Sequence, residues 1–237
     1  MNTIEIIKNK AEENNIELSE KQLSQLDRYM KEILTVNQEI NLTGITEPEA
    51  FIERNIIDSL LIVKDLQPKG MKIADIGTGG GFPGVPLAIY FPEDQFVLID
   101  STKKKLDVVE TAVKKIGLSN VKVLAGRAEE LSRLPEEREQ YDYVVSRAVA
   151  PLRILCELCL PLLKKGGEMI ALKSARYDLE IKDAENTIKL LGGKLLSTEK
   201  RYILHSDMLH VIIIVEKIRK TPEQYPRSYG QIKKKAL

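Results

Sequence analysis

A cluster of glycines between two apolar segments constrains the fold of this chain more than any other feature. The cluster lies within residues 72–88, KIADIGTGGGFPGVPLA. An apolar run that stops at Gly77 is typical of a buried strand in a parallel sheet. The glycines permit a turn that side chains would block, and they let a ligand lie against main-chain amides. The apolar residues after Gly84 predict a helix, so strand, turn and helix N-terminus together predict a nucleotide-type binding loop.

Two ligands fit such a loop, and the charge of the strand before it distinguishes them. Residues 79–84, GGGFPG, satisfy the G-x-G-x-x-G pattern of dinucleotide sites. Asp75, however, places a carboxylate two residues before the turn, where it would repel a pyrophosphate. S-adenosylmethionine carries an ammonium and a sulfonium group and no phosphate. The pattern therefore favours S-adenosylmethionine as cofactor, with Asp75, Gly77, Thr78 and Gly79 as candidate contacts.

Length, charge and cysteine content limit the function classes. The 237 residues suffice for one sizeable core with a small appended lobe. A net charge of only +1 means that nucleic-acid binding would depend on local basic patches. The two cysteines, Cys156 and Cys159, lie on an apolar helical pattern without a second ligand pair, which predicts buried structural thiols and no metal site.

The apolar segments also indicate where in the cell we expect the protein. The N-terminus is polar and charged, and the longest apolar run, Val211 to Val215, is far too short to span a bilayer. We therefore expect a soluble, cytoplasmic protein without membrane contact, and we expect it to be a monomer.

Helical patterns dominate the first quarter of the chain. Ser19 and Gln22 form a capping-box pattern before apolar residues at helical spacing. Thr46 is a candidate cap for a further helix that begins near Pro48. The predicted helices cover residues 2–14, 19–40 and 48–65.

Two further strands add candidate cofactor contacts. The strand over residues 95–100 ends in Asp100, about 20 residues beyond the glycines, where a ribose-binding carboxylate belongs in a doubly wound sheet. The strand over residues 121–125 leads into a turn that would lie beside the adenine ring in a Rossmann-like methyltransferase. We expect main-chain amides near Ala128 and the carboxylate of Glu129 to meet the adenine edge there.

The next two strands end in basic residues. One strand begins at Tyr141 and ends at Arg147, and the other begins near Gly166 and ends at Lys173. Ligands bind outside the carboxyl ends of parallel strands, so a basic residue there is a functional candidate. We expect Arg147 and Lys173 to position a ligand, and we assign no residue to the chemical step.

The closing segments identify the fold class. Residues 193–204 and 209–217 are apolar and joined by a short link, which predicts an antiparallel hairpin. Five strands alternating with helices and then a closing hairpin predict an α/β fold, the Rossmann-like seven-stranded sheet of class I S-adenosylmethionine-dependent methyltransferases. A nicotinamide dehydrogenase would not be expected to end this way.

The sequence pattern predicts three parts of the chain. They are an N-terminal helical extension (1–66), a Rossmann-like methyltransferase domain (67–219) and a basic C-terminal tail (220–237). The tail mixes proline, tyrosine and basic residues, which suits either a solvated tail or contacts with single-stranded RNA.

Scattered basic residues are candidates for RNA contacts. Arg54 lies four residues before Asp58, a spacing that predicts a local ion pair as readily as a place along the cleft. Lys103 opens a run of three lysines in the first turn of a helix, where the helix dipole disfavours them. This run indicates either a solvated face or a contact with an RNA backbone. The RNA-binding candidates are Arg54, Lys103, Lys173, Arg201 and Arg227.

Several segments, in order along the chain, resemble the RsmG (GidB) family of bacterial methyltransferases that act on N7 of a guanine in small-subunit (16S) ribosomal RNA. The segment from Asp75 to Ala88 carries most of this resemblance. The supporting segments are NLT at 41–43, RNIIDSL at 54–60, DSTKKK at 100–105, GRAEE at 126–130, SRAVA at 146–150 and YPR at 225–227.

The resemblance implies an S-adenosylmethionine-dependent enzyme whose partner is 16S ribosomal RNA or the small ribosomal subunit. It implies a cofactor site of Gly77, Phe82, Ala128, Glu129 and Arg147. Phe82 enters by resemblance alone, because its apolar surroundings are equally typical of a core residue.

The expected reaction needs little from acid–base chemistry. Guanine N7 has an in-plane lone pair and no proton, so catalysis would come mainly from positioning, worth up to roughly 7–11 kcal/mol in favourable cases. The only histidines, His205 and His210, are expected to be structural or solvated. Two alternatives remain: a methyltransferase of a small molecule or protein, which needs no basic rim, and a non-catalytic RNA-binding module of ribosome assembly, which needs no cofactor pocket.

Overall fold

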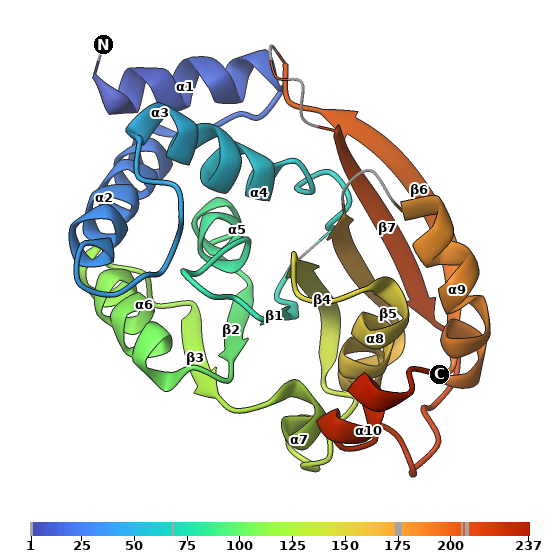
Figure 1. Ribbon diagram of the computed structural model, residues 1–237. Helices are drawn as coiled ribbons and strands as arrows, with labels where there is room; N and C mark the ends of the chain where they lie inside the picture. The colour runs from blue at the N-terminus through green and yellow to red at the C-terminus, as the bar shows by residue number, and fades with distance from the viewer. Residues whose placement is uncertain (1, 68, 174–176, 205, 207–208) are drawn as a thin grey trace.

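A computed structural model describes residues 2–67, 69–173, 177–204, 206 and 209–237. Within these residues one seven-stranded sheet has the order β3-β2-β1-β4-β5-β7-β6 (Figure 1). The pairs among β1 to β5 are parallel, whereas β7 pairs antiparallel with both β5 and β6. The α/β fold with a closing hairpin is therefore confirmed. The strands are β1 Lys72–Ile76, β2 Gln95–Asp100, β3 Val121–Ala125, β4 Tyr141–Arg147, β5 Leu163–Lys173, β6 Gly193–Tyr202 and β7 Leu209–Lys217.

Helices cover both faces of the sheet (Figure 1). Successive strand residues point to opposite faces, so Leu98 packs against one helical layer while Val97 and Ile99 pack against the other. Helices α1, α2, α5 and α6 share the first core, and α8 and α9 share the second. The bounds are α1 Thr3–Glu13, α2 Glu20–Asn37, α5 Gly84–Tyr90, α6 Lys103–Lys115, α7 Ala128–Leu131, α8 Leu152–Cys159, α9 Tyr177–Leu190 and α10 Tyr229–Lys234.

The N-terminal helices pack on the sheet and share its core. The capping box predicted for Ser19 and Gln22 is present at the start of α2. Leu26 and Met30 of α2 lie in the same buried cluster as Val85 of α5 and Leu98 of β2. Burial of this apolar surface, and not helix propensity alone, therefore holds the extension in place.

The prediction of one continuous helix over residues 48–65 is wrong. It consists of α3 (Pro48–Phe51), a π-helical turn η1 (Ile52–Ile57) and α4 (Asp58–Leu60), and its N-cap is Glu47 instead of Thr46. A π-helical turn bonds each residue to the fifth one along, so residues four apart no longer lie above one another. The predicted Arg54–Asp58 pair is accordingly absent from the ion pairs of the described chain, and Asp58 contacts Arg147 instead.

The C-terminal residues fold back onto the domain instead of forming a solvated tail. Ile232 of α10 is completely buried in the same core cluster as Leu155 and Cys156 of α8. Cys156 and Cys159 are free and buried, as predicted, and burial raises the pKa of the Cys156 thiol to about 12. Both thiols are therefore packing groups.

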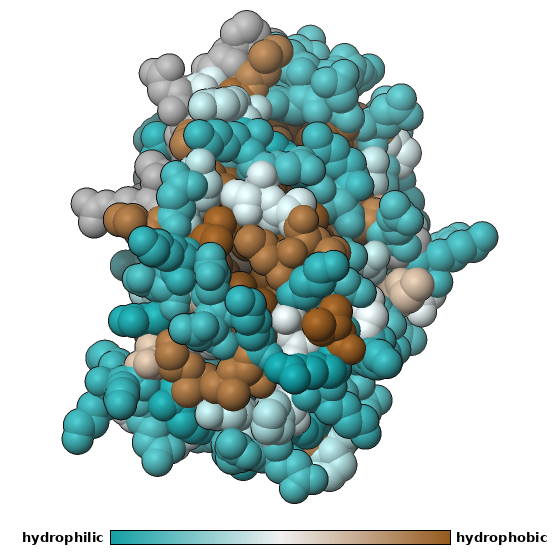
Figure 2. Space-filling model, turned by 90° about the vertical axis from the view of Figure 1, so that its right-hand side faces the viewer, coloured by the Kyte–Doolittle hydropathy of each residue, from teal (hydrophilic) through white to brown (hydrophobic). Residues whose placement is uncertain are grey.

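The outer surface on the side of β6 and α9 is mostly hydrophilic, with separate apolar patches (Figure 2). Exposed apolar side chains on these two elements include Leu179, Leu190 and Leu196. None of the described helices is long and apolar enough to cross a membrane.

Candidate functional site

The glycine loop lies at the carboxyl ends of β1 and β2, where the predicted binding loop belongs. The amides of Gly77 and Thr78 both donate to the carbonyl oxygen of Ile99, at 2.8 and 3.1 Å. Gly77 has a φ of +71°, and a Cβ added there would lie 2.4 Å from a methyl carbon of Val149. Only glycine therefore leaves space between the first turn of the loop and the segment after β4.

Asp75 lies beneath this loop. Its side chain is fully buried, and its Oδ2 accepts hydrogen bonds from Thr78 Oγ1 at 2.7 Å and from the Gly84 amide at 2.8 Å. Burial, the largest cause, raises the pKa of Asp75 to about 6 even though these two hydrogen bonds act to lower it. Asp75 and Thr78 thus brace the loop from inside, and their contact with a cofactor stays a prediction.

A pocket opens where the loop meets the ends of β2 and β3. Asp100 lines it and accepts hydrogen bonds from the Gly79 amide at 3.0 Å and the Thr102 amide at 2.8 Å. Ala128 and Glu129 line the opposite wall at the start of α7. The structure therefore brings Gly77, Asp100, Ala128 and Glu129 together around one hollow, as the sequence predicts.

Glu129 is the unsatisfied group of this pocket. Its side chain is only 6% exposed, and its Oε1 has no hydrogen-bond partner among the described residues. The nearest cation is the guanidinium of Arg127, 3.9 Å away. Burial raises the pKa of Glu129. An unpaired buried carboxylate oxygen is costly, and a ligand that donates a hydrogen bond would remove that cost.

The C-terminal segment supplies a pocket wall that sequence reasoning missed. Tyr229 lines the pocket, and the guanidinium carbon of Arg127 lies 5.0 Å from the centroid of its ring. The signal in the sequence was the mixture of tyrosine and basic residues in the tail, which we interpreted as solvated or RNA-binding. The structure instead places this tyrosine beside Glu129, because α10 packs on the domain.

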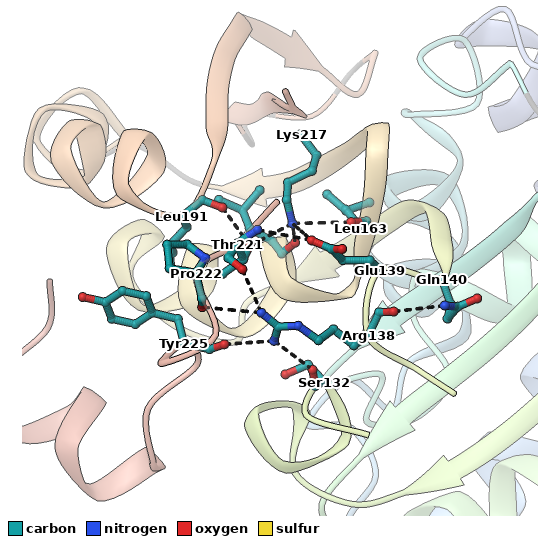
Figure 3. A network of polar contacts seen from close by, with 11 residues as sticks. Ser132, Arg138, Glu139, Gln140, Leu163, Leu191, Lys217, Thr221, Pro222 and Tyr225 are labelled. Atoms are coloured by element: carbon teal, nitrogen blue, oxygen red, sulfur yellow. Dashed lines mark hydrogen bonds and ion pairs between the residues drawn. The ribbon is translucent and has the colours of Figure 1, made fainter. Parts of the chain in front are cut away.

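A buried polar network anchors the segment that leads to Tyr229 (Figure 3). Lys217 is completely buried, and its ammonium donates to the carbonyl oxygen of Leu160 and to Thr221 Oγ1, the latter at 2.8 Å. Arg138 donates to the carbonyl oxygens of Thr221 and Tyr225, each at 2.9 Å. The turn after β7 is thereby tied to the segment before β4.

Phe82 lies in an aromatic cluster behind the loop and does not line the pocket. Its ring makes edge contacts with Tyr29 and Phe51, at centroid distances of 5.8 and 5.5 Å. Arg147 lies over the same ring at 5.7 Å. These contacts make Phe82 a packing residue in this structure, and the cofactor role implied by the resemblance stays a prediction.

A second hollow adjoins the first at the carboxyl end of β4 and the start of β7, and Arg147 is one of its lining residues. Its guanidinium donates to Asp58 Oδ2 at 2.5 Å, to Asn55 Oδ1 at 2.9 Å and to the carbonyl oxygen of Arg54 at 2.6 Å. The imidazole of His210 approaches Asp58 from the other side, with Nδ1 2.6 Å from Oδ1. Sequence reasoning placed Arg147 at this edge but missed its partners.

The pKa of Asp58 reflects this arrangement. Burial acts to raise it, yet the hydrogen bond from His210 and the charge of Arg147 together lower it below its usual value. Asp58 is therefore an ionised carboxylate held between two donors.

The candidate RNA-binding residues are either exposed or already paired within the chain. Arg54 and Lys103 are exposed. Lys173 lines the second hollow, but its ammonium donates to the carbonyl oxygen of Ala150 at 2.8 Å and pairs with Glu180 at 2.6 Å.

Arg201 and Arg227 already have partners within the chain. Arg201 is 8% exposed and pairs with Asp65 and Glu199. Arg227 pairs through two nitrogens with Glu157, which is fully buried. Burying the carboxylates of Asp65 and Glu157 requires the paired cations, so the structure favours a role in stability for both arginines.

Comparison with known proteins adds a family to this geometry. A family model described as "rRNA small subunit methyltransferase G" matches residues 22–205. A protein of that name from Clostridium novyi is 44% identical over 96% of this chain and 94% of its own length. One from Clostridium tetani is 40% identical over the whole of both chains.

Solved structures match in fold alone. A SAM-dependent O-methyltransferase from Thermotoga maritima superposes with a TM-score of 0.53 and 17% identity, over 80% of this chain and 72% of that one. The YcgJ protein from Bacillus subtilis has a TM-score of 0.54 at 14% identity, over 69% of this chain and 99% of its own. The likeness supports the predicted fold class.

Proposed function

Because the chain belongs to the rRNA small subunit methyltransferase G family, we propose that it transfers a methyl group from S-adenosylmethionine to N7 of one guanine in 16S ribosomal RNA. The observation that carries this proposal is identity of about 40% with family members over nearly the whole chain. The enzyme's partner is then the small-subunit RNA, free or in a particle. We further propose that it acts as a monomer in the cytoplasm.

The pocket at the ends of β1 to β3 fits S-adenosylmethionine. A Cβ at Gly77 would fill the space that the loop leaves beside Val149, and the unpaired Oε1 of Glu129 needs a donor such as an adenine amine. Asp100 would bind the ribose hydroxyls, and the first amides of α7, near Ala128, would meet the adenine edge. When bound, this cofactor supplies an electrophilic methyl group on a cationic sulfur.

The chain's own residues then have to hold the base and keep it oriented. Guanine N7 presents a lone pair without a proton, so no side chain has to remove one before the transfer. Positioning accounts for most of the rate enhancement in such a reaction, up to roughly 7–11 kcal/mol. Arg147 is suited to this task because Asp58 and Asn55 lock its guanidinium at the edge of the sheet.

The test is methyl incorporation from labelled cofactor into small-subunit RNA and particles that lack the modification, followed by nucleoside mapping. We expect label in 7-methylguanosine at one position. Cofactor binding without label in either RNA form would overturn the ribosomal substrate and leave a methyltransferase of a small molecule or protein. Failure to bind the cofactor at all would favour a non-catalytic module.

A further inference from the structure

Two buried polar atoms without partners face the second hollow, next to the proposed cofactor pocket. Asn55 is 3% exposed and His210 is 6% exposed, and both line this hollow. Among the described residues, neither Asn55 Nδ2 nor His210 Nε2 has a hydrogen-bond partner. Buried polar groups are nearly always paired, so two unpaired ones around one hollow indicate a ligand.

The partners of these two side chains determine what each unpaired atom offers. Asn55 Oδ1 accepts from Arg147, which orients the amide so that Nδ2, a donor, is the free atom. Asp58 Oδ1 lies 2.6 Å from His210 Nδ1 and, apart from this contact, has no hydrogen-bond partner among the described residues. An ionised carboxylate at that distance favours the proton on Nδ1. In the neutral ring Nε2 is then an acceptor. The hollow therefore presents one donor and one acceptor.

Guanine carries the complementary pair on its Watson–Crick edge, where the O6 acceptor lies beside the N1–H donor. Adenine has the opposite order, with an amine beside an N1 acceptor. Recognition through the Watson–Crick edge also leaves N7 free, as the proposed reaction requires. The hollow measures about 430 Å³, within the range of small-molecule sites of roughly 300–1,000 Å³.

The hollow and the cofactor pocket are lined by consecutive residues of one short segment. Arg147 and Ala148 line the hollow, while the next residue, Val149, lines the pocket. Ala148 has a φ of +56°, a conformation that non-glycine residues adopt uncommonly. A base held at the start of β7 would thus lie beside the site of the methyl group.

Resting on the function proposed above, we infer that this hollow holds the target guanine, with Asn55 Nδ2 donating to O6 and His210 Nε2 accepting from N1–H. Asp58 is the positioning residue that sets the tautomer of His210, and Arg147 sets the orientation of the Asn55 amide. The base must leave its stack to enter, as it does in other enzymes that modify bases.

The first test concerns the tautomer and needs no activity. The chain has only two histidines, so nitrogen-15 correlation spectra of the imidazoles give two sets of signals. We expect the Nδ1–H tautomer for His210 at neutral pH. A proton on Nε2, in either the neutral or the charged ring, would remove the acceptor and overturn the assignment.

The second test uses two variants that preserve the local contacts. H210N retains an amide nitrogen that donates to Asp58 but lacks Nε2, and N55D retains the oxygen that accepts from Arg147 but replaces the donor with an acceptor. We expect each to raise the KM for RNA by about tenfold or more, within the usual discrimination of base contacts. N186D, which makes the same charge change on the exposed face of α9, is the control.

Cofactor affinity, measured by calorimetry, separates loss of recognition from misfolding. We expect H210N and N55D to bind S-adenosylmethionine as the wild type does. If both variants keep the wild-type KM for RNA, the guanine subsite is wrong while the methyltransferase function stands. If the wild type itself does not methylate guanine N7, the proposed function fails, and the subsite fails with it.

Discussion

The hydroxyl of Tyr29 on α2 donates a hydrogen bond of 2.8 Å to the carbonyl oxygen of Gly80 in the glycine loop. Tyr29 is 1% exposed, and burial raises the pKa of its hydroxyl, which therefore stays protonated as a donor. A Cβ at Gly81 would lie 2.1 Å from the same hydroxyl oxygen. The N-terminal extension is thus part of the support of the candidate cofactor loop.

Replacing Tyr29 by phenylalanine removes this bond and leaves the Gly80 oxygen buried and unpaired. We expect the free energy of unfolding to fall by about 1–3 kcal/mol, the cost of an unsatisfied buried group. Cofactor affinity should fall as well, because the loop loses a fixed contact. Urea unfolding and calorimetry measure the two effects. Y202F, at a side chain that is 60% exposed, should change neither.

Gly77 offers a test of the space beside the loop. In G77A the new methyl group would meet Val149 at 2.4 Å, in addition to the strain of a φ of +71°. G70A carries the same backbone strain, with a φ of +72°, but its Cβ would meet nothing within 4 Å. We expect the backbone strain to cost each variant about 1–2 kcal/mol of stability, and G77A to lose more because of the overlap with Val149. Only G77A should lose cofactor affinity in titration calorimetry. Equal cofactor affinities for the two variants would contradict the proposed pocket.

Glu129 and its neighbour Glu130 form a matched pair for the adenine contact. Glu129 is buried with an unpaired Oε1, whereas Glu130 is exposed. E129Q replaces one acceptor oxygen by a donor, and we expect the Kd for S-adenosylmethionine to rise about tenfold, as for loss of a hydrogen bond to a charged group. E130Q should bind as the wild type does. The proposed adenine contact is wrong if both variants bind alike.

The predictions from the sequence succeeded where a signal is local. The apolar run before Gly77 predicts β1, and the apolar run that ends at Asp100 predicts β2. The parallel topology then brings the carboxyl ends of both strands to one edge of the sheet. The place of the candidate cofactor pocket follows from these few positions, because the parallel strands β1 to β5 end at the same side of the sheet.

The features of the site that the sequence did not predict depend on contacts between segments that lie far apart in the chain. The π-helical turn keeps Asn55 and Asp58 buried beside Arg147, but nothing in the hydrophobic pattern of this segment distinguishes it from a regular helix. His210 looked like a lone polar residue on an apolar strand until the fold placed it 2.6 Å from Asp58. Tyr229 reaches the pocket only because the end of the chain folds back.

Asp75 should make stability depend on pH. Its pKa is near 3.8 in the unfolded chain and about 6 in the folded protein, so the folded state alone keeps the proton between these values. Stability contributed by the protonated carboxyl is present below about pH 4 and is lost as pH rises through about 6, by at most about 3 kcal/mol. In D75N this loss should disappear.

The measurement is urea unfolding of D75N and the wild type from pH 5 to pH 8. The amide of D75N does not titrate, so its own effect on the free energy of unfolding is the same at every pH. The difference in stability between the two proteins should shift in favour of D75N as pH rises toward 6 and then level off. A difference that does not vary with pH would contradict a raised pKa for Asp75.

Lys217 anchors the C-terminal segment, and its replacement should release that segment. K217M fills a similar volume but removes the buried ammonium that donates to the Leu160 carbonyl oxygen. The same ammonium donates to Thr221 Oγ1 and pairs with Glu139 (Figure 3). We expect a loss of about 3 kcal/mol, as for other broken buried polar pairs, measured by urea unfolding. Chymotrypsin should also cut faster after Tyr229, because the segment no longer packs on the domain.

K220M provides the control, since Lys220 is exposed three residues further along the same turn. It should match the wild type in stability and in protease resistance. Because Tyr229 lines the cofactor pocket, K217M should also bind S-adenosylmethionine more weakly than K220M does. Faster cleavage of K217M with unchanged cofactor affinity would show that the C-terminal segment is anchored as described but that Tyr229 contributes no wall to the occupied pocket.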